Sequence, residues 1–99
     1  MHSIFDGANL LSINAKSSYF SGASFKYAHL EKADLSGANL SKTDFTGASL
    51  ENCNLSKAIL IGAKITPEQL TQSKNLECAV MPDGTVFNPN NIICKDRLS

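Results

Sequence analysis

The sequence predicts an all-β solenoid over residues 3–66, followed by a C-terminal cap over residues 67–99 that begins with a short helix. Three observations predict this fold: large apolar residues recur at every fifth position, small residues precede them by two places, and glycines follow them by two places. An amphipathic helix would repeat its apolar residues at spacings of three and four, and a half-buried strand at a spacing of two. A spacing of five fits neither pattern and is typical of a solenoid, in which each unit buries its apolar side chains by stacking on its neighbours.

The large apolar residues of this spacing form a predicted central column that points into the solenoid. They are Phe5, Leu10, Phe20, Phe25, Leu30, Leu35, Leu40, Phe45, Leu50, Leu55, Leu60 and Ile65. Ala15 interrupts the column, and Ile13 stands where the other repeats have a small residue. Because large and small residues exchange places there, we expect the first coil to be packed least tightly.

Five of the six glycines support the same register, because they fall two places after a central residue. They are Gly7, Gly22, Gly37, Gly47 and Gly62. A chain that turns a corner at this place needs a positive φ angle, which glycine adopts at low steric cost. The glycines therefore predict a corner between successive central residues.

Several segments of the chain share one short pattern, and they read A-N-L-L-S, A-D-L-S-G, A-N-L-S-K, T-D-F-T-G and A-S-L-E-N. These segments resemble the pentapeptide-repeat family, whose consensus is A-(D/N)-L-x-x, over about two thirds of the chain. The resemblance implies a right-handed, four-sided β-helix of about three coils, with one pentapeptide on each side and about twenty residues in each coil. Stacking at that interval places Phe5 over Phe25 and Phe45 along one inner edge.

The five-residue spacing stops at Ile65, and the next residues predict a helix from Pro67 to about Ser73. Thr66 is a favourable N-cap, Pro67 suits the first helical position, and Gln69 at the third position completes a capping box. The cap therefore begins with a short helix that follows the last repeat directly.

The residues after this helix predict a partial further coil and then a tail. Met81 and Val86 are again five residues apart, and Pro82-Asp83-Gly84 between them is favourable turn chemistry. The segment T-P-E-Q-L with a later P-D-G turn also resembles C-terminal caps of pentapeptide-repeat proteins. We expect Ile92 and Ile93 to dock near the end of the tail.

Polar residues at outward positions form three candidate columns when the chain is stacked coil on coil. They are His29 with Asn9 and Ser49, Asp34 with Asn14 and Asn54, and Glu31 with Glu51. We interpret them as structural or solvated, because no nucleophile shares the column of His29 and the predicted surface is convex. The sequence contains no Gly-rich phosphate loop and no Cys/His cluster with metal-ligand spacing. It therefore predicts no catalytic residue, no cofactor and no metal site, and a protein that is not an enzyme.

The three cysteines have different expected roles. Cys53 occupies an inward small position and is interpreted as a packing residue. Cys78 and Cys94 both lie in the cap, and the sequence is compatible with a disulfide between them or with two free thiols. A disulfide implies an oxidising compartment, whereas the lack of a signal segment and of an apolar run of about 20 residues predicts a cytoplasmic protein that does not enter a membrane.

Two functional hypotheses remain, and the first is a non-catalytic scaffold or protein-interaction module whose partner is another protein. The second is implied by the resemblance, since some pentapeptide-repeat proteins mimic DNA and thereby inhibit or protect DNA gyrase. A DNA mimic needs a sustained acidic surface, yet residues 3–66 carry five acidic residues against six lysines. This balance favours the first hypothesis, and because no face concentrates lysine it also argues against nucleic-acid binding.

Two surfaces are candidates for contacts with other molecules. Tyr19, Ile59 and Ile61 are apolar residues at outward positions of one predicted side, and either the C-terminal segment covers them or they dock a partner. The first coil has no predicted capping helix before Ile4, so its open edge predicts either association between copies or further repeats in a longer protein.

Overall fold

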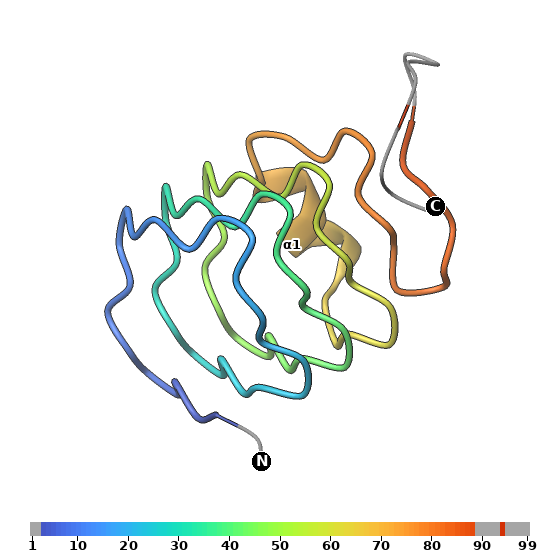
Figure 1. Cartoon of the computed structure of the whole chain (residues 1–99). Helices are drawn as coiled ribbons and strands as arrows, with labels where there is room; N and C mark the ends of the chain where they lie inside the picture. Colours follow the sequence, from blue (N-terminus) through green and yellow to red (C-terminus); the bar gives the residue numbers. More distant parts are fainter. Residues whose placement is uncertain (1–2, 89–93, 95–99) are drawn as a thin grey trace.

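The computed structural model describes residues 3–88 and Cys94, and it shows coils stacked side by side along one axis (Figure 1). Parallel bridges join each coil to the next at residues twenty apart, such as Ile4 with Ser24 and Ser24 with Asp44. Each coil contributes one bridged residue in every five, so the described residues form isolated bridges and no extended strand. The one helix of this part of the chain is α1 (Pro67–Gln72), which lies at the end of the stack.

Backbone hydrogen bonds explain why the coils stack in this register. The N–H of His29 donates to the carbonyl of Ala8 at 2.9 Å, and the carbonyl of His29 accepts from the N–H of Leu10 at 2.8 Å. Both backbone groups of a bridged residue therefore point to the preceding coil. The same two bonds recur on every side of the stack, so each coil serves as the template for the next.

From Phe5 to Leu60 the chain turns a corner every five residues, and the second residue of each of these corners has a positive φ. The five glycines of the repeats have φ between 68° and 77°, as their positions predict. Non-glycine residues adopt the same conformation at the other corners: Ser12, Ser17, Tyr27, Lys32, Lys42, Asn52 and Lys57. A left-handed conformation costs an L residue about 1–2 kcal/mol, so the ladder of hydrogen bonds imposes the corner whatever residue occupies it.

The core lies along the axis of the stack and is filled by the central column. The central residues from Phe25 to Leu60 are at most 1% exposed, and Phe5, Leu10, Phe20 and Ile65 at the two ends are half-buried. Phe25 is stacked between Phe5 and Phe45, with ring centroids 5.0 and 5.3 Å away. The first coil is thus the least buried, because no described coil covers its outer side.

Helix α1 closes the other end by taking over the hydrogen bonds of a further coil. Within the stack, the N–H of Ser49 donates to the carbonyl of Ala28 in the preceding coil. In a further regular coil, the backbone N–H of the residue twenty positions after Ser49 would donate to the carbonyl of Ala48 in the same way. That residue is Gln69, which lies in the helix, and its side-chain Nε2 donates instead to the carbonyls of Ala48 at 3.0 Å and Phe45 at 2.6 Å. Gln69 is buried for this reason.

Gln69 also completes the predicted capping box of α1. Its Oε1 accepts from the N–H of Thr66 at 2.9 Å, and its own N–H donates to Oγ1 of Thr66 at 3.1 Å. One side chain therefore holds the start of the helix and satisfies two carbonyls of the last coil.

We expect Gln69→Leu to lower the free energy of unfolding by about 2 kcal/mol, because leucine fills the space but leaves the carbonyl of Ala48 without its donor. The carbonyl of Phe45 keeps the N–H of Ala48 as a donor. Urea denaturation followed by circular dichroism measures this change. Gln72→Leu is the matched control, since Gln72 is exposed and its Oε1 accepts one long bond of 3.4 Å from the N–H of Leu50. Equal losses for the two variants would contradict the role assigned to Gln69.

After the helix, the chain forms the predicted partial coil, but with a spacing of twenty-one residues. Asn75 bridges to Asn54 and Val80 to Ile59, both in parallel. The extra residue is accommodated by the helix, which replaces one corner and one side of a regular coil.

The prediction that Val86 continues this coil is wrong. Val86 pairs with Val80 in the antiparallel direction, so the chain reverses at the Pro82-Asp83-Gly84 turn. The N–H of Phe87 donates to the carbonyl of Ala79 at 2.8 Å, and the reversed segment occupies the free edge of the partial coil. A spacing of five residues fits either a continuing coil or this tight hairpin, and only the backbone pairing distinguishes them.

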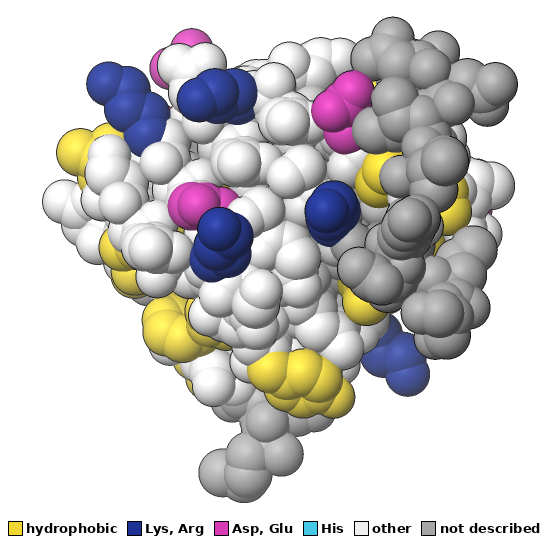
Figure 2. All heavy atoms as spheres, turned by 45° about the horizontal axis from the view of Figure 1, so that its top comes forward, with side chains coloured by type: hydrophobic (Ala, Val, Ile, Leu, Met, Phe, Trp, Pro, Cys, Tyr) yellow, Lys and Arg dark blue, Asp and Glu magenta, His cyan; other side chains and the backbone are white. Residues whose placement is uncertain are grey.

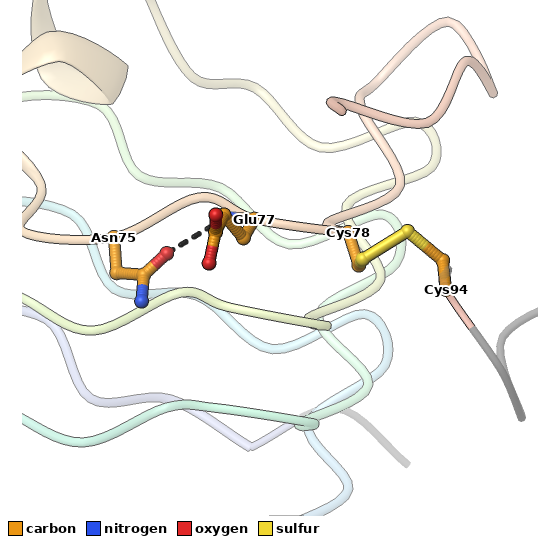
Figure 3. The surroundings of a disulfide bond; sticks show 4 residues. All are labelled: Asn75, Glu77, Cys78 and Cys94. Atoms are coloured by element: carbon orange, nitrogen blue, oxygen red, sulfur yellow. Dashed lines mark hydrogen bonds between the residues drawn. A yellow bond between two sulfur atoms is a disulfide. The ribbon is translucent and has the colours of Figure 1, made fainter. Parts of the chain in front are cut away.

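A disulfide between Cys78 and Cys94 ties the C-terminal segment to the partial coil (Figure 3). The two sulfur atoms are 2.04 Å apart, and the two α-carbons are 5.5 Å apart. Of the two alternatives that the sequence allowed, the structure therefore has the bonded one. Cys53 is the free cysteine of the described residues and is fully buried, as predicted. The predicted docking of Ile92 and Ile93 lies outside the described residues.

Candidate functional site

The three residues of the predicted docking surface, Tyr19, Ile59 and Ile61, do not form one patch. Tyr19 bridges to Asn39, and Asn39 bridges to Ile59, so the half-buried amide of Asn39 separates the two apolar side chains. Tyr19 lies in the first coil and is 77% exposed. Tyr19 is thus about two rungs of 4.8 Å from Ile59 and belongs to the opposite end of the stack.

Ile59 and Ile61 remain together in the last full coil, beside the cap. Ile59 is half-buried next to Val80, and Ile61 is 46% exposed. The carbonyl of Pro82 accepts from the N–H of Gly62 at 3.0 Å, which places the cap beside this corner without covering the side chain of Ile61. We call Ile59, Ile61 and Pro82 the Ile61 surface.

The polar columns of Asp34 and of His29 are formed as predicted, and the side chains of the Asp34 column cap the corners. Asn14, Asp34, Asn54 and Asn75 bridge in sequence, as do Asn9, His29 and Ser49. In the first column each side-chain Oδ1 accepts from the N–H two residues later, for example Asp34 from Ser36 at 3.0 Å and Asn54 from Ser56 at 3.0 Å. These residues therefore stabilise turns, which accounts for Asn and Asp at this position of the repeat.

Asp34 shows how the turn acts on a carboxylate. The hydroxyl of Ser36 donates to Oδ1 of Asp34 at 2.6 Å, and the N–H of Ser36 donates to the same oxygen. These two bonds lower the pKa of Asp34 from its ordinary value of 3.8. The ammonium groups of Lys16 and Lys74 are smaller causes of the same shift. A carboxyl whose pKa is lower in the folded state stabilises the fold above its unfolded value and loses that contribution as the pH falls through the folded value.

We expect Asp34→Asn to weaken the dependence of stability on acid while changing stability little at neutral pH. Asparagine keeps the accepting oxygen, as Asn54 does at the equivalent position one coil later, but it does not titrate. Urea midpoints measured from about pH 7 down to about pH 2 should therefore fall less steeply for the variant below about pH 4. Superimposable curves for the two proteins would contradict this assignment.

The described residues do not assemble a catalytic or metal-binding cluster. No group of three or more His, Cys, Asp and Glu residues in this part of the chain is arranged to hold a metal ion. Nδ1 of His29 lies 3.4 Å from a carboxylate oxygen of Glu31, but both sit on an open outer face. Burial raises the pKa of the Cys53 thiol to about 12, so this group is neither a nucleophile nor a ligand at neutral pH.

Sequence reasoning missed an apolar hollow of about 480 Å³ beside α1. Its lining includes the apolar side chains of Leu70, Leu76, Met81 and Phe87, together with Lys74. Leu70 lies in the helix that the sequence predicts from Pro67 to about Ser73. Phe87 could not be placed, because its position depends on the chain reversal after Met81.

The outer surface has mixed charge. On the face seen in Figure 2, lysine and acidic side chains are interspersed among uncharged ones and form no continuous field of one sign. Lys26 and Asp44, one coil apart, form an ion pair at 4.0 Å. No helix in the described part of the chain is long and apolar enough to span a membrane.

The repeats of this chain match a known protein family. The family model for pentapeptide repeats matches residues 3–41 and 33–66 in eight copies. The chain belongs to the pentapeptide-repeat family. The matched residues coincide with the bridged coils, and the cap lies beyond them.

Solved pentapeptide-repeat structures resemble this chain. It is 29% identical to alr5209 of Nostoc PCC 7120, with a TM-score of 0.69 over 97% of this chain and 83% of that one. Against HetL, a protein of the same organism involved in heterocyst differentiation regulation, identity is 27% and the TM-score 0.46, over 85% of this chain and 43% of HetL. Against a pentapeptide repeat protein of the Arabidopsis thaliana thylakoid lumen, identity is 27% and the TM-score 0.42, over 86% of this chain and 66% of that one. No curated protein matches the sequence.

Proposed function

We propose that this pentapeptide-repeat chain is a non-catalytic interaction module that presents the Ile61 surface to another protein. The observation that carries the proposal is the exposed Ile61 side chain beside the half-buried Ile59 and Pro82. The outward positions one coil earlier in the same columns hold Asn39 and Ser41, which are polar. An apolar patch with a polar border is typical of a protein-binding surface.

The platform for this surface is the right-handed, four-sided β-helix that the family resemblance implies. Four bridged residues in each coil of twenty residues support this arrangement. The Cys78–Cys94 disulfide favours an oxidising compartment, where such bonds persist, over the cytoplasmic location that the sequence predicts.

Affinity capture from the native host tests the proposal, with wild type, Ile61→Lys and Tyr19→Lys as baits. We expect a specific partner that binds wild type and Tyr19→Lys and is lost with Ile61→Lys, because a lysine there places a charge in the apolar patch. Circular dichroism must first show that all three baits are folded. A partner that binds all three equally would place the docking surface elsewhere.

No observation favours the alternative of a DNA mimic that acts on gyrase. The mixed charge of the coils lacks the sustained negative field that such a mimic requires. We expect purified gyrase to be neither inhibited nor protected from quinolones by micromolar amounts of the chain in a supercoiling assay. Inhibition in that assay would favour the alternative over the interaction module.

A further inference from the structure

The apolar hollow beside α1 lies where the core of the stack ends. Leu76 follows the bridged Asn75, and Met81 follows the bridged Val80, so both occupy central positions of the partial coil. The central residues of the full coils from Phe25 to Leu60 are buried, whereas Leu76 and Met81 are half-buried. The hollow is therefore a part of the core that the described cap leaves uncovered.

The size and the lining of the hollow fit a small apolar ligand. Its volume of about 480 Å³ falls in the range that small-molecule sites occupy. Leu70 of α1 and Phe87 of the reversed segment line it together with Leu76 and Met81, and Phe87 is 39% exposed. A ligand that covers these side chains is stabilised by the apolar surface that it removes from water.

Lys74 gives this apolar site a positive charge. It is the one charged residue of the described lining, and it makes no ion pair with a described residue. The hydroxyls of Thr71 and Ser73, which also line the hollow, donate to the carbonyls of Glu68 at 2.8 Å and Leu70 at 2.6 Å. Because these hydroxyls have already donated their hydrogens, the ammonium of Lys74 is the side-chain donor that remains for a ligand.

The backbone N–H of Leu76 is a second donor at the hollow. In the full coils, the N–H of a central residue donates to the following coil, as Leu55 does to the carbonyl of Asn75 at 2.9 Å. The N–H of Met81 donates to Thr85 of the reversed segment, but the N–H of Leu76 has no acceptor among the described residues. By the same register it points past the partial coil, to the end of the stack at which the hollow lies. An unpaired backbone N–H beside apolar surface favours a ligand that carries an acceptor.

We propose that the apolar hollow binds a small carboxylate with an apolar chain, the chemistry of a medium-chain fatty acid. The carboxylate accepts from the Lys74 ammonium and from the N–H of Leu76, which its two oxygens allow. The apolar chain covers Leu70, Met81 and Phe87. An alcohol of the same length lacks the ion pair, and an amine of the same length is repelled by Lys74, so the site selects its ligand by charge.

Calorimetric titration of the 99-residue chain with octanoate, octan-1-ol and octylammonium tests the proposal. We expect saturable one-to-one binding of octanoate with a dissociation constant below about 1 mM. Octan-1-ol should bind at least about tenfold more weakly, and octylammonium should not bind. Absence of saturable octanoate binding, or equal affinity for the three ligands, would overturn the proposal.

Lys74→Met keeps an apolar stem and removes the charge, so it should reduce the preference for octanoate over octan-1-ol to less than about threefold. Lys32→Met is the matched control. Lys32 lies beside Lys74 at a neighbouring polar hollow with Asp34, but it is not part of the apolar lining, so this variant should keep the preference. Equal losses in the two variants would show that the ligand is held by general positive charge and would contradict the assigned site.

The apolar part of the site is tested without a mutation by shortening the ligand. Each CH₂ group removed from octanoate should weaken binding about three- to fourfold, and an affinity that does not depend on chain length would contradict the role of the hollow. Phe87→Ser should weaken octanoate binding at least about fivefold, whereas Ile61→Ser, which removes another exposed apolar side chain, should not. Circular dichroism must show that both variants are folded.

Nuclear magnetic resonance locates the bound carboxylate. The amide resonance of Leu76 should shift on addition of octanoate, and that of Leu55, already bonded to Asn75, should not. Binding that leaves the Leu76 amide unchanged would overturn the assigned geometry. A dimer that octanoate dissociates in sedimentation velocity would identify a second copy as the occupant and would also overturn the proposal. The Ile61 surface uses other residues, so this proposal and partner capture can fail separately.

Discussion

Replacing Phe25 by alanine is expected to lower the free energy of unfolding by about 3–5 kcal/mol, which is a large share of the stability of so small a protein. Phe25 is 1% exposed and lies between the parallel rings of Phe5 and Phe45. The ring of Phe20 also contacts it edge-on, with centroids 5.4 Å apart. Removal of the ring leaves a cavity between two coils, and a stack held by backbone bonds on every side cannot collapse to fill it.

Thermal and urea denaturation measure this loss, and Phe5→Ala is the internal comparison. Phe5 is half-buried at the end of the same row of rings, so its truncation should cost clearly less. Phe25→Leu should recover part of the lost stability, because it restores most of the apolar volume. If Phe5→Ala and Phe25→Ala proved equally destabilising, the row of stacked rings would not be the centre of the core.

Loss of the Cys78–Cys94 disulfide is expected to destabilise the protein by about 3 kcal/mol, the loop-closure entropy for a separation near 16 residues. The bond holds the C-terminal segment to the partial coil at a corner where Cys78 has φ 62°. Without it, the reversed segment that contains Val86 and Phe87 keeps its backbone pairing but loses its tether. We therefore expect the cap to open before the coils in the Cys94→Ser variant.

A reductant titration measures this contribution without a mutation. Dithiothreitol should lower the melting temperature of wild type to that of Cys94→Ser and leave the variant unchanged. Thiol labelling of the unfolded, unreduced wild type should modify Cys53 alone. Labelling of all three cysteines under these conditions would show that the bond is absent from the purified protein.

The coils could be predicted from the sequence because the residues of each repeat determine the local structure of their own side of the coil. A central residue such as Leu35, the small Ala33 before it and the capping Asp34 between them each agree with the same local geometry. Neighbouring repeats favour the same local structure, so a single residue that departs from the pattern does not change the predicted fold. Ala15 departs from the pattern, and its coil still follows the register.

The parts that could not be predicted depend on contacts that a local pattern does not encode. Tyr27 and Lys57 have positive φ because the ladder imposes it, although neither residue favours that conformation. Gln69 was recognised as a capping residue, but its bonds to Phe45 and Ala48 required the position of the last coil. The predicted direction of the chain at Val86 was wrong because it too depends on contacts with another part of the fold, the partial coil.

The candidate surfaces were predicted less well than the fold. Counting residues along the sequence assigned Tyr19, Ile59 and Ile61 to one side, and the bridges confirm that Tyr19 and Ile59 share a column. A cap at the C-terminal end and an open edge at the first coil were predicted from the sequence, but the interruption of the column of Tyr19 and Ile59 by Asn39 was not recognised. Exposure and edge pairing, which distinguish the ends, are properties of the assembled stack.

The bonds that close the stack reach no further back than its last full coil. Gln69 and Gln72 contact backbone groups from Phe45 to Asn52, and Val80 contacts those of Ala58 and Leu60. Every earlier coil is joined solely to its immediate neighbours. Duplication or deletion of one coil's worth of sequence near the N-terminus would therefore change the distance between the two ends in steps of about 4.8 Å and leave both ends intact. The length of the stack can therefore change by whole coils without any change to the residues that form its two ends.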